Sequence, residues 1–237
     1  MHISYHLYPC GDHAVTIELG NRIDVSVNNR VIALFQHLQS LQVNGIRDII
    51  PSYHTVTLVY DPVFFYNKAG TGTVYEYLCE WLHDIVRKQL HADIHPRKLR
   101  IPVCYDPSLA WDMAYVAERH GITIEEVIQL HVSATYRVYL VGFLPGFAYM
   151  GTVDARIATP RKASPRAMVP EGSVGIAGEQ TGIYPFASPG GWQIIGQTPV
   201  HMFHAHAAQP CYLQPGDEVN FYPVDMITFQ QMKLHEH

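Results

Sequence analysis

Glycine and proline gather in one stretch of the chain, between Leu144 and Pro199. This stretch holds nine of the 17 glycines and seven of the 16 prolines. Breakers at this density interrupt helices and leave only short apolar runs, such as Val174–Ala177 and Trp192–Ile195. Many short strands joined by Gly/Pro turns are typical of a barrel or a sandwich. The second half of the chain is therefore expected to be a compact β-structure.

The first part of the chain reads differently, with longer regular runs. Strands are predicted at 5–8, 14–19, 46–50 and 55–60 from their β-type residues and flanking turns. Two helices are predicted between and after them. The first carries an apolar stripe of helical spacing, and the second begins with a capping box in which Thr73 and Glu76 satisfy free amides. The resulting order, ββαββα, predicts a small α/β sandwich over residues 1–95.

A domain boundary is predicted at His95–Pro96, because proline disfavours helix at the residue before it. The second domain, 96–237, opens with a predicted strand at Lys98–Cys104. Two short helices follow, the second capped by Thr123 with Glu126, and then a strand over Tyr136–Phe143. We therefore predict an α+β protein in which a small N-terminal α/β sandwich precedes a β-barrel domain.

Composition excludes several classes of protein. The formal net charge is -5 and no basic stripe stands out, so a nucleic-acid footprint is missing. None of the four cysteines forms a Cys-x-x-Cys pair, which favours free thiols in a reducing compartment. No apolar run is long enough to span a bilayer, and the start of the chain does not resemble a signal peptide. A cytoplasmic protein without nucleic-acid or membrane partners is expected.

Two arginines are candidates for binding an anion. Arg161 and Arg166 each follow a proline, which stiffens the backbone next to the guanidinium. Arginine binds carboxylates and phosphates through two parallel hydrogen bonds, so this pair is suited to an anion clamp. Two exposed loop arginines are the alternative interpretation.

A Gly-rich segment at 170–185 and one histidine are further candidates. The glycines allow backbone amides to approach a ligand, and Ser173, Gln180, Thr181 and Tyr184 add neutral hydrogen-bonding groups. The segment matches neither a nucleophile elbow nor a phosphate loop, and a run of tight turns is the alternative. His131 lies on the apolar face of a predicted helix, where a hydrogen-bonded core histidine competes with a catalytic one.

The histidines at 201, 204 and 206 do not predict a metal site. His204 and His206 would share one face of a strand, but no cysteine or carboxylate stands at ligand spacing. No metal is therefore expected in this chain.

Three blocks of sequence resemble a known family. They are Val141–Gly151, Thr159–Gly178 and Gln180–Gly196. Together with shorter matches in the first domain, they resemble the B subunit of 5-oxoprolinase. The same family is known as allophanate hydrolase subunit 1, as carboxyltransferase subdomain C/D and as a sporulation histidine-kinase inhibitor.

The resemblance implies a cyclophilin-like barrel in the second domain. It also implies a direct partner, the C subunit of 5-oxoprolinase, and a third component, its A subunit, which together would open 5-oxo-L-proline to L-glutamate. ATP would act through the complex, with no biotin or metal in this chain. By position in the matching motifs, the resemblance suggests four catalytic and four substrate-binding residues: His131, Tyr136, Ser173 and Tyr184, and Arg161, Arg166, Gln180 and Thr181.

The resemblance leaves alternatives and shows departures. A urea-derived amide or allophanate is an alternative substrate, and docking to a histidine kinase is an alternative role. Prolyl isomerase activity is suggested by barrel analogy alone, and fold does not carry function. After Gly196 the family usually has Arg-Thr and later Leu-Phe-Asp-Pro. Gln197 and the segment Met202–Ala205 stand there instead.

Overall fold

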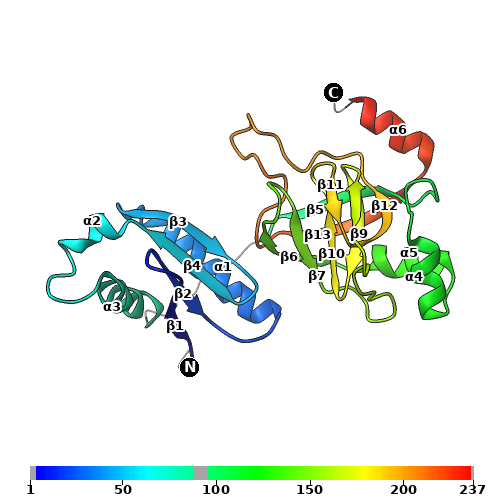
Figure 1. Ribbon diagram of the computed structural model, residues 1–237. Helices are drawn as coiled ribbons and strands as arrows, with labels where there is room; N and C mark the ends of the chain where they lie inside the picture. Colours follow the sequence, from blue (N-terminus) through cyan, green and yellow to red (C-terminus); the bar gives the residue numbers. More distant parts are fainter. Residues whose placement is uncertain (1–3, 88–95, 236–237) are drawn as a thin grey trace. The chain divides into compact units, whose positions relative to one another are not determined.

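In the computed structural model of the protein, residues 4–87 and 96–235 are described (Figure 1). Its internal contacts divide the chain into two compact units, 1–95 and 96–237. The predicted boundary at His95–Pro96 adjoins residues 88–95, which lie outside the described part of the chain. Each unit is described by itself.

The N-terminal unit is a four-stranded antiparallel sheet with helices on one face. The strands lie in the order β1-β2-β4-β3. Figure 1 shows α1 passing behind this sheet. The elements are β1 (His6–Pro9), β2 (Ala14–Glu18), α1 (Val25–Ser40), β3 (Ile46–Pro51), β4 (Thr55–Tyr60), α2 (Pro62–Tyr66) and α3 (Val74–Arg87).

Alternation along the strands explains why both long helices share a face. Val15 and Ile17 of β2 pair with Leu58 and Val56 of β4, so the four side chains point the same way. They form one buried cluster with apolar residues of α1 and α3. The predicted ββαββα arrangement is confirmed, with the short α2 as an additional element.

Side-chain caps determine where these helices begin. Asp24 accepts hydrogen bonds from two backbone amides at the start of α1, and Asp61 does the same for α2. The predicted capping box is confirmed, because Thr73 and Glu76 each accept a hydrogen bond from the other's backbone amide. Pro62 is the first residue of α2, a position that proline favours because its missing amide has no partner in the helix.

The second unit is built on a closed barrel of seven strands in the order β10-β7-β6-β13-β5-β12-β9. The first of these strands in the chain, β5, pairs in parallel with the last, β13, and the other barrel neighbours are antiparallel. The predicted α+β class with a C-terminal barrel is confirmed. The barrel strands are β5 (Lys98–Cys104), β6 (Tyr136–Val141), β7 (Ala148–Gly151), β9 (Ser173–Ala177), β10 (Gln180–Ile183), β12 (Gln193–Gln197) and β13 (Glu218–Val224).

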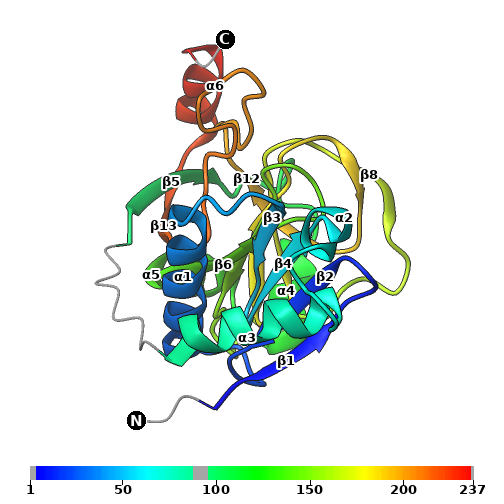
Figure 2. The same cartoon turned by 90° about the vertical axis from the view of Figure 1, so that its left-hand side faces the viewer.

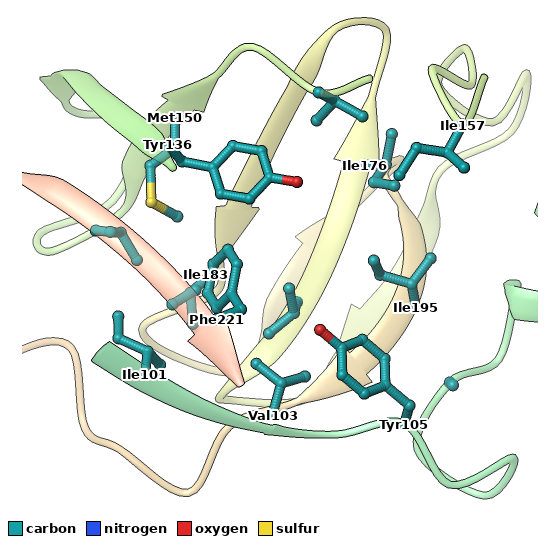
Figure 3. Packing of buried hydrophobic residues seen from close by; sticks show 14 of the residues in the cluster. Ile101, Val103, Tyr105, Tyr136, Met150, Ile157, Ile176, Ile183, Ile195 and Phe221 are labelled. Atoms are coloured by element: carbon teal, nitrogen blue, oxygen red, sulfur yellow. The ribbon is translucent and has the colours of Figure 1, made fainter. Parts of the chain in front are cut away.

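The barrel is filled rather than hollow. Apolar side chains from all seven strands, most of them branched or aromatic, meet in one buried cluster. Figure 3 shows Tyr105 and Tyr136 pointing into this interior among the aliphatic side chains. Because successive strand residues face opposite sides, every second residue of these strands points outward.

A two-stranded layer covers part of the outside of the barrel. It consists of β8 (Arg166–Val169) and β11 (Ser188–Gly190), and Figure 2 shows β8 lying outside the barrel strands. Beneath it is a second buried cluster, which includes Tyr184, Trp192 and Ile194. The residues next to them in the chain, Ile183 and Ile195, face the barrel interior instead. The barrel therefore has a separate apolar layer on its outer face.

Three helices flank the barrel: α4 (Met113–His120), α5 (Ile124–Ser133) and α6 (Met226–His235). The predicted box of Thr123 and Glu126 caps α5, and Gly121 ends α4 in a left-handed conformation that suits glycine. Among the described residues, no helix combines the length and the apolarity needed to cross a membrane.

Candidate functional site

The eight predicted site residues divide between the two sides of the barrel wall. Thr181 and Ile183 alternate with Gln180, Gly182 and Tyr184 along β10 and its continuation, so they face opposite ways. The residues that meet inside are His131, Tyr136 and Thr181. Those on the other side or in its loops are Arg161, Arg166, Ser173, Gln180 and Tyr184.

His131 is the centre of the interior group. Its side chain is fully buried, and its ring stacks on Phe221 with centroids 4.7 Å apart. The Tyr105 hydroxyl lies 2.7 Å from Nδ1, and Thr181 Oγ1 lies 3.2 Å from Nε2. The Tyr136 hydroxyl donates to the backbone carbonyl of His131. Both ring nitrogens therefore have partners inside the barrel.

The hydrogen-bond network assigns the protons of this group. Thr181 Oγ1 donates to the Gly175 carbonyl, so it accepts from His131, and Nε2 carries the ring proton. Nδ1 then accepts from Tyr105. Burial lowers the pKa of His131 to about 3, and burial raises the pKa of Tyr105 well above its ordinary value. The interior group is therefore neutral at physiological pH.

The exterior group is built around Arg161. Its guanidinium lies 5.7 Å from the centre of the Trp192 ring, which is a cation–π distance. Arg161 is exposed and has no ion-pair partner among residues 4–87 and 96–235. Its charge also reaches Tyr149 and Tyr184: burial raises the pKa of both hydroxyls, and the positive charge of Arg161 acts against that rise. The outer face thus combines aromatic rings with Arg161, a cation that has no ion-pair partner in the described chain.

Arg166, the second predicted clamp residue, is already engaged. Its Nη2 donates to Asp112 Oδ1 at 2.7 Å, and its guanidinium lies 5.3 Å from the centre of the Trp111 ring. Its Nη1 is covered and has no hydrogen-bond partner among the described residues. The two arginines are therefore not equivalent, because one faces solvent and the other is held by a carboxylate.

The remaining predicted residues have mixed positions. Ser173 is buried at the start of β9, and its carbonyl accepts from the Tyr184 amide. Tyr184 is buried in the outer apolar layer, against Phe147 at 5.3 Å between ring centres. Gln180 is half-buried at the start of β10. Of these three, Tyr184 lies within reach of the charge of Arg161. The predicted catalytic or binding roles of all three stay predictions.

The histidine-rich segment is held by a different contact. His201 Nδ1 lies 2.7 Å from Glu171 Oε1, and the rings of His201 and His204 are 5.8 Å apart at their centres. Within the described part of the chain, no three His, Cys, Asp or Glu side chains come close enough together to hold a metal ion.

Sequence reasoning missed Asp112 and Trp111. Asp112 stands at the N-cap of α4, a position where aspartate normally caps the helix. Here the side chain makes no capping hydrogen bond and instead accepts from the arginine loop, residues 161–166, which ends at the first residue of β8. A local pattern would have indicated only a cap, since its partners lie 50 or more positions away in the chain.

A shallow cavity of about 450 Å³ borders Tyr105, at the end of β5 and β13. Its other lining residues include Asp106, Ile128 and Met226. Tyr105 thus joins the interior group to this cavity, whereas His131 itself does not line it.

The exterior face offers a positive charge, hydroxyls that stay protonated and apolar rings, which suits binding of a small carboxylate.

Comparison with known proteins gives a consistent family assignment. Residues 5–213 match the family described as carboxyltransferase domain, subdomain C and D. The chain is 37% identical over 243 residues to the 5-oxoprolinase B subunit of Bacillus subtilis (strain 168), and the match covers 98% of each chain. It is 36% identical over 217 residues to the 5-oxoprolinase B subunit of Escherichia coli O157:H7, covering 91% of this chain and 94% of the relative.

Solved structures agree with this fold. The crystal structure of TTHA0988 superposes with a TM-score of 0.76 at 34% identity and covers 90% of this chain. This chain spans 40% of that longer protein. The structure of Kluyveromyces lactis urea carboxylase, at 20% identity, covers 96% of this chain with a TM-score of 0.74, and this chain spans 22% of it.

Proposed function

The chain belongs to the carboxyltransferase-domain family, subdomain C and D, and we propose that it is the B subunit of a 5-oxoprolinase complex. The observation that carries this proposal is the 37% identity to a 5-oxoprolinase B subunit over 98% of both chains. In such a complex the lactam ring of 5-oxo-L-proline is opened by water to give L-glutamate. The partner A and C subunits and ATP complete the reaction.

The exterior face supports a binding role in that reaction. The substrate is a small flat ring bearing one carboxylate. Arg161 is an exposed cation without an ion-pair partner in the described chain, and it stands over Trp192. A guanidinium binds a carboxylate through two parallel hydrogen bonds. We assign binding of the substrate carboxylate to Arg161 rather than to Arg166, because Arg166 already forms an ion pair with Asp112.

Activation of the amide belongs to the rest of the complex. A lactam is a stable amide, and opening it at neutral pH requires energy from ATP. The chain has no Gly-Lys-Ser/Thr phosphate loop. We therefore assign nucleotide binding to a partner subunit and substrate orientation to this chain.

Omission of each component tests the proposal. Glutamate released from 5-oxo-L-proline and ATP is measured for this chain alone, for the A and C subunits without it, and for the full mixture. Release only in the full mixture is expected. Equal release from the A and C subunits without this chain would refute the proposal. The lactam 2-pyrrolidinone, which lacks the carboxylate, is expected to react poorly in the same mixture.

A urea-derived amide is the second candidate substrate. The chain is 26% identical over 246 residues to a urea amidolyase of Lachancea kluyveri, covering 90% of this chain and 13% of that protein. Urea and allophanate are offered to the same mixtures with ATP. Ammonia release from them, together with no glutamate release from 5-oxo-L-proline, would favour this alternative.

A further inference from the structure

Asp112 joins three segments that are far apart in the chain. Its Oδ1 accepts from Lys162 Nζ at 3.2 Å and from Arg166 Nη2 at 2.7 Å. Its Oδ2 accepts from the backbone amide of Ile194 at 2.7 Å. The carboxylate thus connects the start of α4, the arginine loop up to the first residue of β8, and the strand β12.

This carboxylate is covered and charged. The Asp112 side chain is 5% exposed, while those of Lys162 and Arg166 are 30% and 22% exposed. Burial alone would raise the pKa of Asp112, but the hydrogen bonds from Arg166 and the Ile194 amide lower it overall. A buried charge needs its partners, so the loop cations are held close to it.

The backbone on both sides of Arg161 is held as well. Gln193 Nε2 donates to the Pro160 carbonyl at 2.8 Å, and the Lys162 amide donates to the Gly191 carbonyl at 2.7 Å. The Lys162 side chain then reaches Asp112. Arg161 stands between these two anchors, so its Cα has little freedom to move.

The three cations of the loop differ in whether they pair with Asp112. Two of them, Lys162 and Arg166, share the single negative charge of Asp112. Arg161 remains without an ion-pair partner in the described chain and lies over Trp192. Asp112 therefore fixes the loop through Lys162 and Arg166 and leaves Arg161 available to a ligand.

We propose that Asp112 is a positioning residue, which holds Lys162 and Arg166 so that the loop presents Arg161 to a substrate carboxylate. The part of this inference that concerns substrate rests on the proposed function. The part that concerns the loop does not, and the two are tested separately.

Trypsin cleavage tests the loop, because the loop contains three cleavable residues. Asp112→Asn keeps the size of the side chain and removes its charge. We expect initial cleavage after Arg161 to be about 10-fold faster than in the wild type, because freed loops open more often. Asp154→Asn is the matched control, since it breaks a bidentate pair with Arg156 in the same connection between β7 and β8 but leaves the contacts of Asp112 with Lys162 and Arg166. Equal cleavage of the Asp112→Asn variant and the wild type would overturn the proposal.

A second variant keeps this test valid if Asp112→Asn does not fold. Lys162→Met removes one anchor and leaves the contacts of Asp112 with Arg166 and Ile194. Faster cleavage after Arg161 is expected here too. Wild-type cleavage in this variant would contradict the loop role.

Kinetics of the full complex test the link to substrate. We expect Asp112→Asn to raise KM for 5-oxo-L-proline about 10-fold and to change kcat by less than about 3-fold. If Asp112 acts through Arg161, the double variant with Arg161→Ala is no worse than Arg161→Ala alone. Additive losses would overturn the positioning role. Absence of turnover in every mixture would refute the proposed function, while the trypsin result would still decide the loop role.

Discussion

The two sides of the barrel wall use polar residues in opposite ways. Inside, His131, Tyr105 and Thr181 satisfy one another, and the group carries no charge. Outside, Asp112 carries a charge that two cations share, and Arg161 is left without a counterion in the described chain. A closed neutral network stabilises a fold, whereas an unmatched surface charge is available to a ligand. The difference supports our proposal that the substrate is recognised at the outer face.

Truncating the interior histidine is expected to have the largest effect. His131→Ala removes a fully buried ring and leaves Tyr105 and Thr181 without their partner. We expect a loss of about 3 kcal/mol in the free energy of unfolding, measured by urea denaturation. The exposed His204→Ala is the control, with a change within about 0.5 kcal/mol. A His131 variant of unchanged stability and no turnover would place catalysis inside the barrel and break the comparison.

Acid is expected to affect the interior before the exterior. The pKa of His131 is about 3 in the folded protein and roughly 6.5 when unfolded, so the unfolded state binds the proton first. Stability present above pH 6.5 is lost as the pH falls. Wild type should lose about 1.4 kcal/mol per pH unit more than His131→Gln, or roughly 2 kcal/mol by pH 5. Because the pKa of Asp112 is lowered in the folded protein, the stability that this carboxylate contributes is lost only below about pH 4. Parallel pH profiles for the two proteins would show that His131 titrates normally.

Truncating Arg161 is expected to have the smallest effect of the three changes and to leave the fold intact. Arg161→Ala should lower kcat/KM of the complex for 5-oxo-L-proline about 10-fold, because one charged contact to the carboxylate is lost. Its free energy of unfolding should change by less than about 0.5 kcal/mol, as for the exposed Arg156→Ala control. Unchanged kcat/KM with lowered stability would make Arg161 a structural residue and reverse the comparison.

Local signals predicted much of the fold and little of the site. The strand at Lys98–Cys104 and the capping box of Thr123 with Glu126 were both predictable, because their signals lie within a few residues. The helix α6 was missed: its exposed Ile227 and Leu234 and its buried Phe229 do not form an apolar stripe. Asp112 was missed for a different reason, since three segments must fold before its partners meet.

The long reach of Asp112 has a consequence for the order of assembly. Its contacts with Lys162, Arg166 and Ile194 span 50, 54 and 82 positions of the chain. Contacts of such separation form late, because closing the intervening chain costs entropy that only neighbouring structure offsets. The arginine loop can therefore be held only once β12 has joined the barrel. We expect newly made chains to lack the proposed binding face until the barrel is closed, so that any partner recognising the ordered loop would bind only fully folded molecules.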